Sequence, residues 1–265
     1  MRPAIVLIAF LPFLYYAIRD ARFHFTGRKV TFAEHVIHLA IGFALAIVLV
    51  QAVMGNSTLM LVGLALLCVA GGADEYIWHR RIPEIETDLH AKEHLALLIF
   101  VVATLVVNWL EAHQWRIPRD LLDPPAAITP VIGEEEAGGA QAGVRGIPWF
   151  RGVLIPLCLV PYAYFGLSDN LHHLRYRRVS WAERILHLTI VLAVLTVVAH
   201  AIEGHRSVML MGLVLFLIAR AADEWGFHRQ LPGDESDMHA KTHFAFLIFV
   251  ATSAAVDWVA QRIAA

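Results

Sequence analysis

Eight stretches of the chain are almost free of charged residues, and they limit the possible folds more than any other feature. They cover residues 3–18, 39–54, 57–73, 95–110, 152–167, 185–199, 207–221 and 244–261. With their flanking helical turns, most of them reach roughly 20 residues, which is the length of an α-helix that crosses a hydrocarbon core about 30 Å thick. We therefore predict an all-α integral membrane protein with eight transmembrane helices.

The composition agrees with a protein that lies in lipid. Hydrophobic residues make up 58% of the chain and charged residues 17%, whereas about 25% of a soluble domain is charged. No basic stripe lies outside the membrane flanks, so we expect no nucleic-acid partner. The two cysteines, Cys68 and Cys158, stand alone in apolar runs and provide neither a disulfide framework nor a thiolate metal motif.

The chain also matches itself. Shifted by 149 residues, residues 10–109 align without a gap on residues 159–258, with 40 identities in the 100 pairs. A period this long is typical of a duplicated bundle and not of a solenoid. We predict two tandem, parallel four-helix bundles, formed by residues 1–111 and 150–265, with an extramembrane linker at 112–149.

The repeat also indicates how the chain enters the membrane. The first apolar stretch could pass for a signal peptide, but its counterpart lies in mid-chain, so we expect it to be the first helix. Four spans per copy give both copies the same direction, as in transporters with parallel repeats. Arginine and lysine are twice as frequent on the side reached after the first span, 14 against seven. We expect that side to be cytoplasmic, with both termini outside, in a bacterial inner membrane.

Histidines and acids stay in register across the repeat although about 60 of the 100 pairs differ. The histidine pairs are His24/His173, His38/His187, His79/His228, His90/His239 and His94/His243. The acid pairs are Asp20/Asp169, Glu34/Glu183, Asp74/Asp223, Glu75/Glu224, Glu86/Glu235 and Asp88/Asp237. Ionisable groups beside transmembrane spans are costly and usually mark a functional site.

The spacing of these residues points to metal binding. In each copy, four pairs are separated by four residues, which places both members on one helix face, as in His-x-x-x-His zinc helices. Because the spans alternate in direction, all four pairs meet at the cytoplasmic side. The predicted ligands are Asp20, His24, Glu34, His38, Glu75, His79, His90 and His94, with Asp169, His173, Glu183, His187, Glu224, His228, His239 and His243 in the second copy.

Some of these residues have a structural alternative. Thr31 with Glu34, and Ser180 with Glu183, fit a capping box, so ligation and capping both stay open for the two glutamates. Asp88 and Asp237, which precede the fourth span of each copy, are either helix N-caps or ligands.

Three further residues close to the predicted ligands in sequence are expected to have other roles. Asp74 is adjacent to Glu75 and cannot share its helix face, so we expect Asp74 either to support the ligands from outside or to form a helix-packing contact. Lys92 and Lys241 are expected to reach to the membrane interface.

The ligand set contains nitrogen and oxygen but no sulfur. It suits iron, manganese or zinc, and it has enough donors for a dinuclear site bridged by carboxylates in each copy. In its ligand types and their place near the membrane surface, the chain resembles membrane hydroxylases and desaturases that hold two irons. Their His-x-x-His-His boxes are absent. Glu75 and His79 followed by His90 also resemble the Asp-x-x-x-His…His copper site of the membrane methane and ammonia monooxygenases.

We therefore expect a metal-dependent membrane oxidoreductase, with iron favoured over zinc and manganese, that hydroxylates or desaturates a lipid-soluble small molecule. Its partners would be the lipid bilayer, that substrate and an electron donor. Three alternatives remain open: a divalent-metal transporter or metal-binding membrane protein, a zinc-dependent membrane hydrolase, and a b-type cytochrome.

Overall fold

The computed structural model describes residues 1–27, 31–79, 84–113, 149–176, 180–228 and 233–264. All regular elements in these ranges are helices, which confirms the all-α prediction. They are α1 (Arg2–Gly27), α2 (Phe32–Met54), α3 (Ser57–Ala73), the π-helical turn η1 (Asp74–Trp78), α4 (Glu84–Ala112), α5 (Trp149–Tyr176), α6 (Trp181–Glu203), α7 (Arg206–Ala222), the π-helical turn η3 (Asp223–Phe227) and α8 (Gly233–Ala264). The linker expected at 112–149 lies almost entirely outside the described residues.

Seven of the described helices are long and apolar enough to cross a membrane, so seven of the eight expected spans have the length and composition of a membrane span. The eighth, α7, has 17 residues like α3, but it carries Arg206 and Arg220 whereas α3 has no charged residue. Large apolar side chains are exposed along the outer helices, for example Leu39 on α2 and Leu195 on α6. A surface of this kind suits lipid and not water, and the chain is a helical membrane protein.

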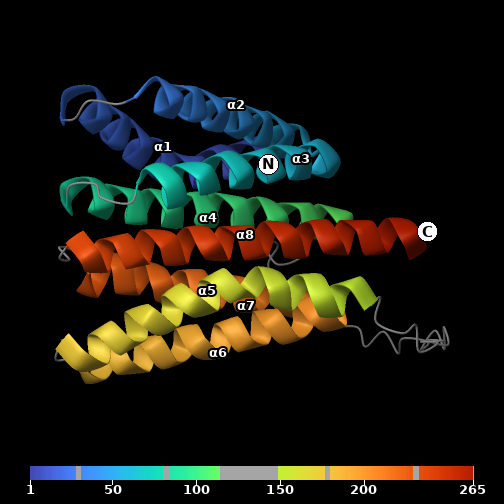
Figure 1. Cartoon of the computed structure of the whole chain (residues 1–265). Coiled ribbons are helices and arrows are strands. Elements are labelled where there is room, and N and C mark those ends of the chain that lie inside the picture. The colour runs from blue at the N-terminus through green and yellow to red at the C-terminus, as the bar shows by residue number, and fades with distance from the viewer. Residues whose placement is uncertain (28–30, 80–83, 114–148, 177–179, 229–232, 265) are drawn as a thin grey trace, which may run out of the picture.

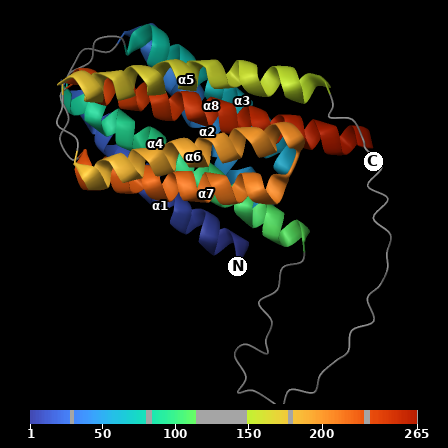
Figure 2. The same cartoon turned by 90° about the horizontal axis from the view of Figure 1, so that it is seen from below.

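Helices α4 and α8 run side by side through the middle of the molecule (Figure 1). Helix α1 packs along α4 and α5 along α8, while α2 pairs with α3 and α6 with α7 (Figures 1 and 2). The apolar core follows the two central helices, with Leu98 and Phe100 on α4 and Leu247 and Phe249 on α8 fully buried. The two halves of the chain therefore share one core.

The halves exchange contacts across this core. Trp225 Nε1 on η3 donates a hydrogen bond of 3.0 Å to the Tyr16 hydroxyl on α1. The Tyr76 ring on η1 stacks on Phe165 of α5, with ring centroids 5.8 Å apart. The two contacts are equivalent under the repeat, because Trp225 is the counterpart of Tyr76 and Phe165 is the counterpart of Tyr16. In each contact, the π-helical turn of one half touches the first helix of the other half.

Sequence signals fix both ends of α2 and α6. Thr31 and Ser180 form the expected capping boxes with Glu34 and Glu183. At the other end, both helices stop at a glycine in the left-handed region, Gly55 with φ 79° and Gly204 with φ 85°. This positive φ favours glycine at both turns, and a Cβ added at either position would also displace the guanidinium end of an arginine, which lies within 2.8 Å.

The two arginines, Arg2 and Arg151, lie at the end of the molecule that holds both glycines, and each donates a hydrogen bond to a backbone carbonyl there. Arg151 donates to the Ala201 carbonyl at 3.2 Å and lies 2.8 Å from Asp257. Arg2 donates to the Ala52 carbonyl at 3.1 Å. We call this end the arginine end.

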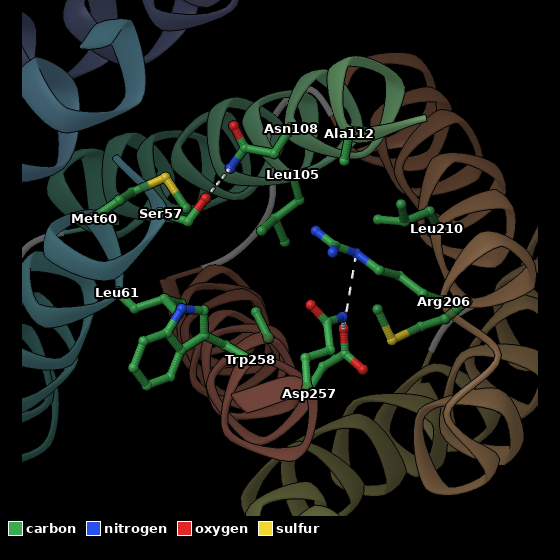
Figure 3. A pocket seen from close by; sticks show the side chains of 13 residues that line it. Ser57, Met60, Leu61, Leu105, Asn108, Ala112, Arg206, Leu210, Asp257 and Trp258 are labelled. Carbon is green, nitrogen blue, oxygen red and sulfur yellow. Dashed lines mark hydrogen bonds and ion pairs between the residues drawn. The ribbon is translucent and has the colours of Figure 1, made fainter. Parts of the chain in front are cut away.

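A cavity of about 220 Å³ opens at the arginine end between α3, α4, α7 and α8 (Figure 3). The Arg206 side chain points into it and lies 3.8 Å from Asp257. Asn108 donates to the Ser57 hydroxyl on its opposite wall, at 3.4 Å. Four of the polar residues that line the cavity thus contact one another in pairs.

Candidate metal centres

Histidines and carboxylates gather at the end of the bundle opposite the arginine end. The first centre comprises Asp20, Glu34, His38, Asp74, Glu75, His79, Glu86, His90 and His94. The second centre comprises Asp169, His173, Glu183, His187, Asp223, Glu224, His228, Glu235, His239 and His243. In each half they come from the end of the first helix, the start of the second, the π-helical turn and the start of the fourth helix.

The π-helical turns decide which acid faces which histidine. The His79 amide donates to the Asp74 carbonyl, five residues back, at 3.0 Å, and His228 does the same with Asp223. This wider turn brings Asp74 beside His79, with 3.5 Å between Oδ2 and Nδ1. The predicted pairing of Glu75 with His79 assumed a regular α-helix and is wrong in this respect, because Glu75 faces His90 and His94. Single π turns inside α-helices are frequent at functional sites.

Glu34, His38, Asp74 and His79 form the peripheral group of the first centre. Asp74 Oδ2 also lies 3.3 Å from His38 Nε2, so this carboxylate stands between two imidazoles. Glu34 Oε1 lies 3.6 Å from His79 Nε2. Donor atoms of Glu34, His38 and His79 all lie within 4.8 Å of one another, close to the spacing of ligands around one metal ion.

Asp20, Glu75, His90 and His94 form the interface group, next to the contact between α4 and α8. Glu75 Oε2 lies 3.9 Å from both His90 Nδ1 and His94 Nε2. Asp20 Oδ2 lies 3.5 Å from His90 Nε2, on the other side of that ring. Here too a carboxylate stands between two imidazoles.

The two groups of the first centre are contiguous. The rings of His79 and His90, one from each group, have centroids 4.5 Å apart. Glu86, which is fully buried, brings a donor atom within 4.8 Å of both histidines. The arrangement therefore offers two neighbouring ion positions with a carboxylate at their junction.

The second centre repeats the peripheral group. Asp223 lies 3.2 Å from His187 Nε2 and 3.4 Å from His228 Nδ1, and Glu183 Oε1 lies 3.3 Å from His228 Nε2. His173 stacks against His187 with ring centroids 5.4 Å apart.

The junction and the interface group of the second centre are also present. Glu235 Oε1 lies 3.2 Å from His173 Nδ1, so Glu235 occupies the junction as Glu86 does. Asp169 Oδ1 lies 3.3 Å from His239 Nε2, and Glu224 Oε2 lies 2.9 Å from His239 Nδ1.

The two centres are tied together through backbone carbonyls. His94 Nδ1 lies 3.1 Å from the Ala240 carbonyl, and His243 Nδ1 lies 2.9 Å from the Ala91 carbonyl. Because a carbonyl only accepts, Nδ1 of each ring carries the proton and Nε2 keeps a lone pair. Such an outer hydrogen bond is typical of histidines that bind metals, since it fixes the ring and its tautomer.

The structure brings together every predicted ligand whose side chain it describes, fifteen of the sixteen. His24 is the exception, because its side chain lies outside the described residues. For Glu34 and Glu183 the two open roles coincide. One oxygen of each accepts from the capping backbone amide at 3.4 Å while the other faces a histidine.

Four acids of the centres lie outside the predicted ligand set. Asp74 and Asp223 had been placed outside the ligand set, yet each lies between two imidazoles. Glu86 and Glu235 stand outside the predicted ligand set, although each precedes a histidine, His90 or His239, by four residues. This spacing and their strict register across the repeat were the signals that could have identified them.

Two other expectations are corrected. Asp88 does not cap α4, because the helix begins at Glu84; Asp88 instead forms an ion pair with Lys92. Asp237 and Lys241 pair in the same way on α8. Lys92, expected to extend to the membrane interface, is 8% exposed. Each of the two lysines therefore forms an ion pair with the aspartate four residues before it.

Buried charge is the main energetic problem of both centres. Asp20, Glu34, Asp74, Glu75 and Glu86 are all buried in the first centre. Among the described residues, the second centre also has ring nitrogens of His173 and His228 that make no hydrogen bond, although carboxylates lie 3.2–3.4 Å away. Divalent cations would neutralise the acids and use these lone pairs, so the donor set fits metal ions.

The fold and the site define a helical membrane protein with buried histidine–carboxylate clusters. Comparison with protein-family models, with curated proteins and with solved structures gives no match. The function has to be argued from the centres themselves.

Proposed function

We propose that this protein is a metal-dependent membrane oxidoreductase that binds metal ions in the two centres. One observation carries the proposal: each half buries five carboxylates among histidines at hydrogen-bond to ion-pair distances, on four helices of a membrane protein. Burial of that much like charge is prohibitive in a low-dielectric site unless cations accompany it. Helix capping accounts for Glu34 and Glu183 but not for the other four acids of each half.

The ligand arrangement favours two adjacent ions in the first centre. The peripheral and interface groups each offer histidines with a carboxylate between them, and Glu86 stands at their junction. This exceeds the four ligands of one tetrahedral ion. It agrees with carboxylate-bridged pairs in helical bundles, where acids and histidines project inward from four helices.

Iron is the favoured metal, with manganese and zinc as the alternatives, since the donors are nitrogen and oxygen only. The ions would supply dioxygen activation when bound. The protein's own residues would hold them in a fixed geometry with ionised carboxylates and imidazole rings, and would exclude water by burial. The apolar outer surface of the helices suits a lipid-soluble substrate and an electron donor that meets the protein at the membrane.

The architecture that we infer is a duplicated four-helix unit with eight membrane-spanning helices. The 149-residue match and the contacts that recur with the same offset support it. On the arginine and lysine distribution, the centres face the cytoplasm of a bacterial inner membrane and both termini lie outside.

A divalent-metal transporter is the second candidate. Imidazole rings form a row from His38, 31% exposed, through His79 and His90 to His94 at the contact between the halves. A row of this kind could pass ions from ligand to ligand. A transporter would release metal to the opposite side, whereas an enzyme would retain it.

Metal analysis of the full chain purified in detergent separates these functions. We expect more than one iron, manganese or zinc ion per chain after dialysis against a weak chelator, and no haem absorption. A reduced, iron-loaded sample freed of reductant should take up dioxygen in an oxygen electrode.

Histidine variants provide the internal control. His79→Ala should lose metal from the first centre, whereas His113→Ala, on an exposed histidine that directly follows the far end of α4, should not. Metal transport across the membrane of proteoliposomes without dioxygen uptake would contradict the enzyme function and support the transporter. No bound metal under any condition would refute both.

A further inference from the structure

The two centres differ at one position that matters for metal binding. Residue 71, at the end of α3, is glycine, and its counterpart at the end of α7 is Arg220. The acids that follow, Asp74 and Asp223, are the same in both halves. The difference therefore introduces a guanidinium into an otherwise repeated set of ligands.

Arg220 reaches into the interface group of the second centre. It is 5% exposed, and its Nε donates to His243 Nε2 at 2.8 Å. Its Nη1 donates to Asp223 Oδ2 at 2.6 Å, and its Nη2 lies 3.8 Å from Asp169 Oδ2. One cationic group thus contacts a histidine and two carboxylates that would otherwise face a metal ion.

His243 has no donor atom left for a metal. Its Nδ1 binds the Ala91 carbonyl at 2.9 Å, and its Nε2 accepts the hydrogen bond from Arg220. His94, the equivalent residue, uses only Nδ1 in this way, toward the Ala240 carbonyl. Its Nε2 points toward Glu75 at 3.9 Å, into the interface group.

The first half has no room for such an arginine. A Cβ at Gly71 would come 2.9 Å from the ring of Phe244, which fills the space beside it. The second half has space near Arg220, where a cavity of about 40 Å³ is lined by Asp169, His187 and Arg220. Glycine and arginine are each matched to their surroundings.

We propose that the Arg220 guanidinium replaces one metal ion, so that the second centre binds one ion fewer than the first. A guanidinium keeps its charge at any physiological pH and binds carboxylates with several parallel donors, so it neutralises Asp169 and Asp223 permanently. The first centre is then the dinuclear, reactive one. This inference rests on the proposed function, since it requires that the centres bind metal.

Metal stoichiometry of the purified full-length protein tests the proposal. With iron or zinc as the probe, the wild type should hold about three ions per chain, two in the first centre and one in the second. Arg220→Gly, which installs the residue of the first half, should raise this by about one ion. Arg220→Lys keeps the charge and should leave it unchanged.

Histidine variants provide a second measurement, and those made in the wild-type background do not require Arg220→Gly to fold. In the wild-type background, His94→Ala should remove about one ion while His243→Ala removes none. In the Arg220→Gly background, His243→Ala should cancel the gained ion.

The outcomes separate this proposal from the function on which it rests. About four ions in the wild type, or equal losses from His94→Ala and His243→Ala, would overturn the replacement by Arg220 while leaving metal binding intact. No metal in any variant would overturn the proposed function and this inference together.

Discussion

The two ends of the helix bundle surround their buried carboxylates with opposite groups. At the arginine end, Arg151 lies 2.8 Å from Asp257 and also binds a helix-terminal carbonyl. At the other end, each half buries five carboxylates among histidines, and Arg220 is the one arginine described within the centres. The protein provides its own cation where neutralisation is purely structural. It presents histidine and carboxylate donors where, on our proposal, metal ions bind.

Metal removal should have the largest effect on stability, and it should act only through the end of the bundle that holds the two centres, which we call the metal end. A ligand present at about 1,000 times its Kd stabilises the native state by about 4 kcal/mol per site. We therefore expect chelation to lower the Tm in detergent by roughly 10 °C or more. Thermal unfolding of metal-loaded and metal-free protein measures this. An unchanged Tm would mean that the metal end, like the arginine end, is stable without added cations.

Arg151→Ala should have the next largest effect. It leaves Asp257 buried without its main partner, a change that typically costs about 3–5 kcal/mol. Metal content should remain that of the wild type, because Arg151 lies at the far end of the bundle. The measurement is Tm together with metal analysis.

Asp257→Asn is the matched control for that variant, because asparagine stands at the equivalent position 108 of the first half. It should cost less than Arg151→Ala, since Arg151 keeps an oxygen acceptor and the Ala201 carbonyl. Loss of metal from Arg151→Ala would contradict the prediction that the two ends of the bundle are independent.

Thr31→Ala and Glu34→Gln should have the smallest effects and should divide the two roles of Glu34. Thr31→Ala removes the helix cap at a cost of about 1 kcal/mol and should leave the metal content unchanged. Glu34→Gln keeps an oxygen for the Thr31 amide but removes the charge beside His79, so metal affinity should fall while the Tm of the metal-free protein changes little. Equal metal loss from both variants would show that Glu34 acts only through the cap.

Much of the fold was accessible from the sequence because membrane spans and internal repeats leave strong, regular signals. The capping boxes at Thr31 and Ser180 and the glycines that end α2 and α6 depend on local chemistry alone. The gathering of histidines at one end followed from alternating helix directions. Each of these inferences needs only neighbours along the chain.

The remaining details depend on geometry that spacing does not encode. The i, i+4 spacing of a regular α-helix predicts that Glu75 faces His79, but the π-helical turn places Asp74 beside His79 instead. Asp88 was expected at a helix end because the apolar stretch starts later than the helix itself. Arg220 was visible as a mismatch with Gly71, yet only the structure places its guanidinium against His243.

X-ray absorption at the metal K edge of the purified protein tests the central claim most directly. The account predicts a first shell of nitrogen and oxygen at about 2.0–2.2 Å with imidazole scattering, and a second metal atom at roughly 3.5–4 Å. His79→Ala should weaken the metal–metal signal. A spectrum with sulfur ligands, or with a lone ion surrounded by water, would contradict the proposed histidine–carboxylate centres.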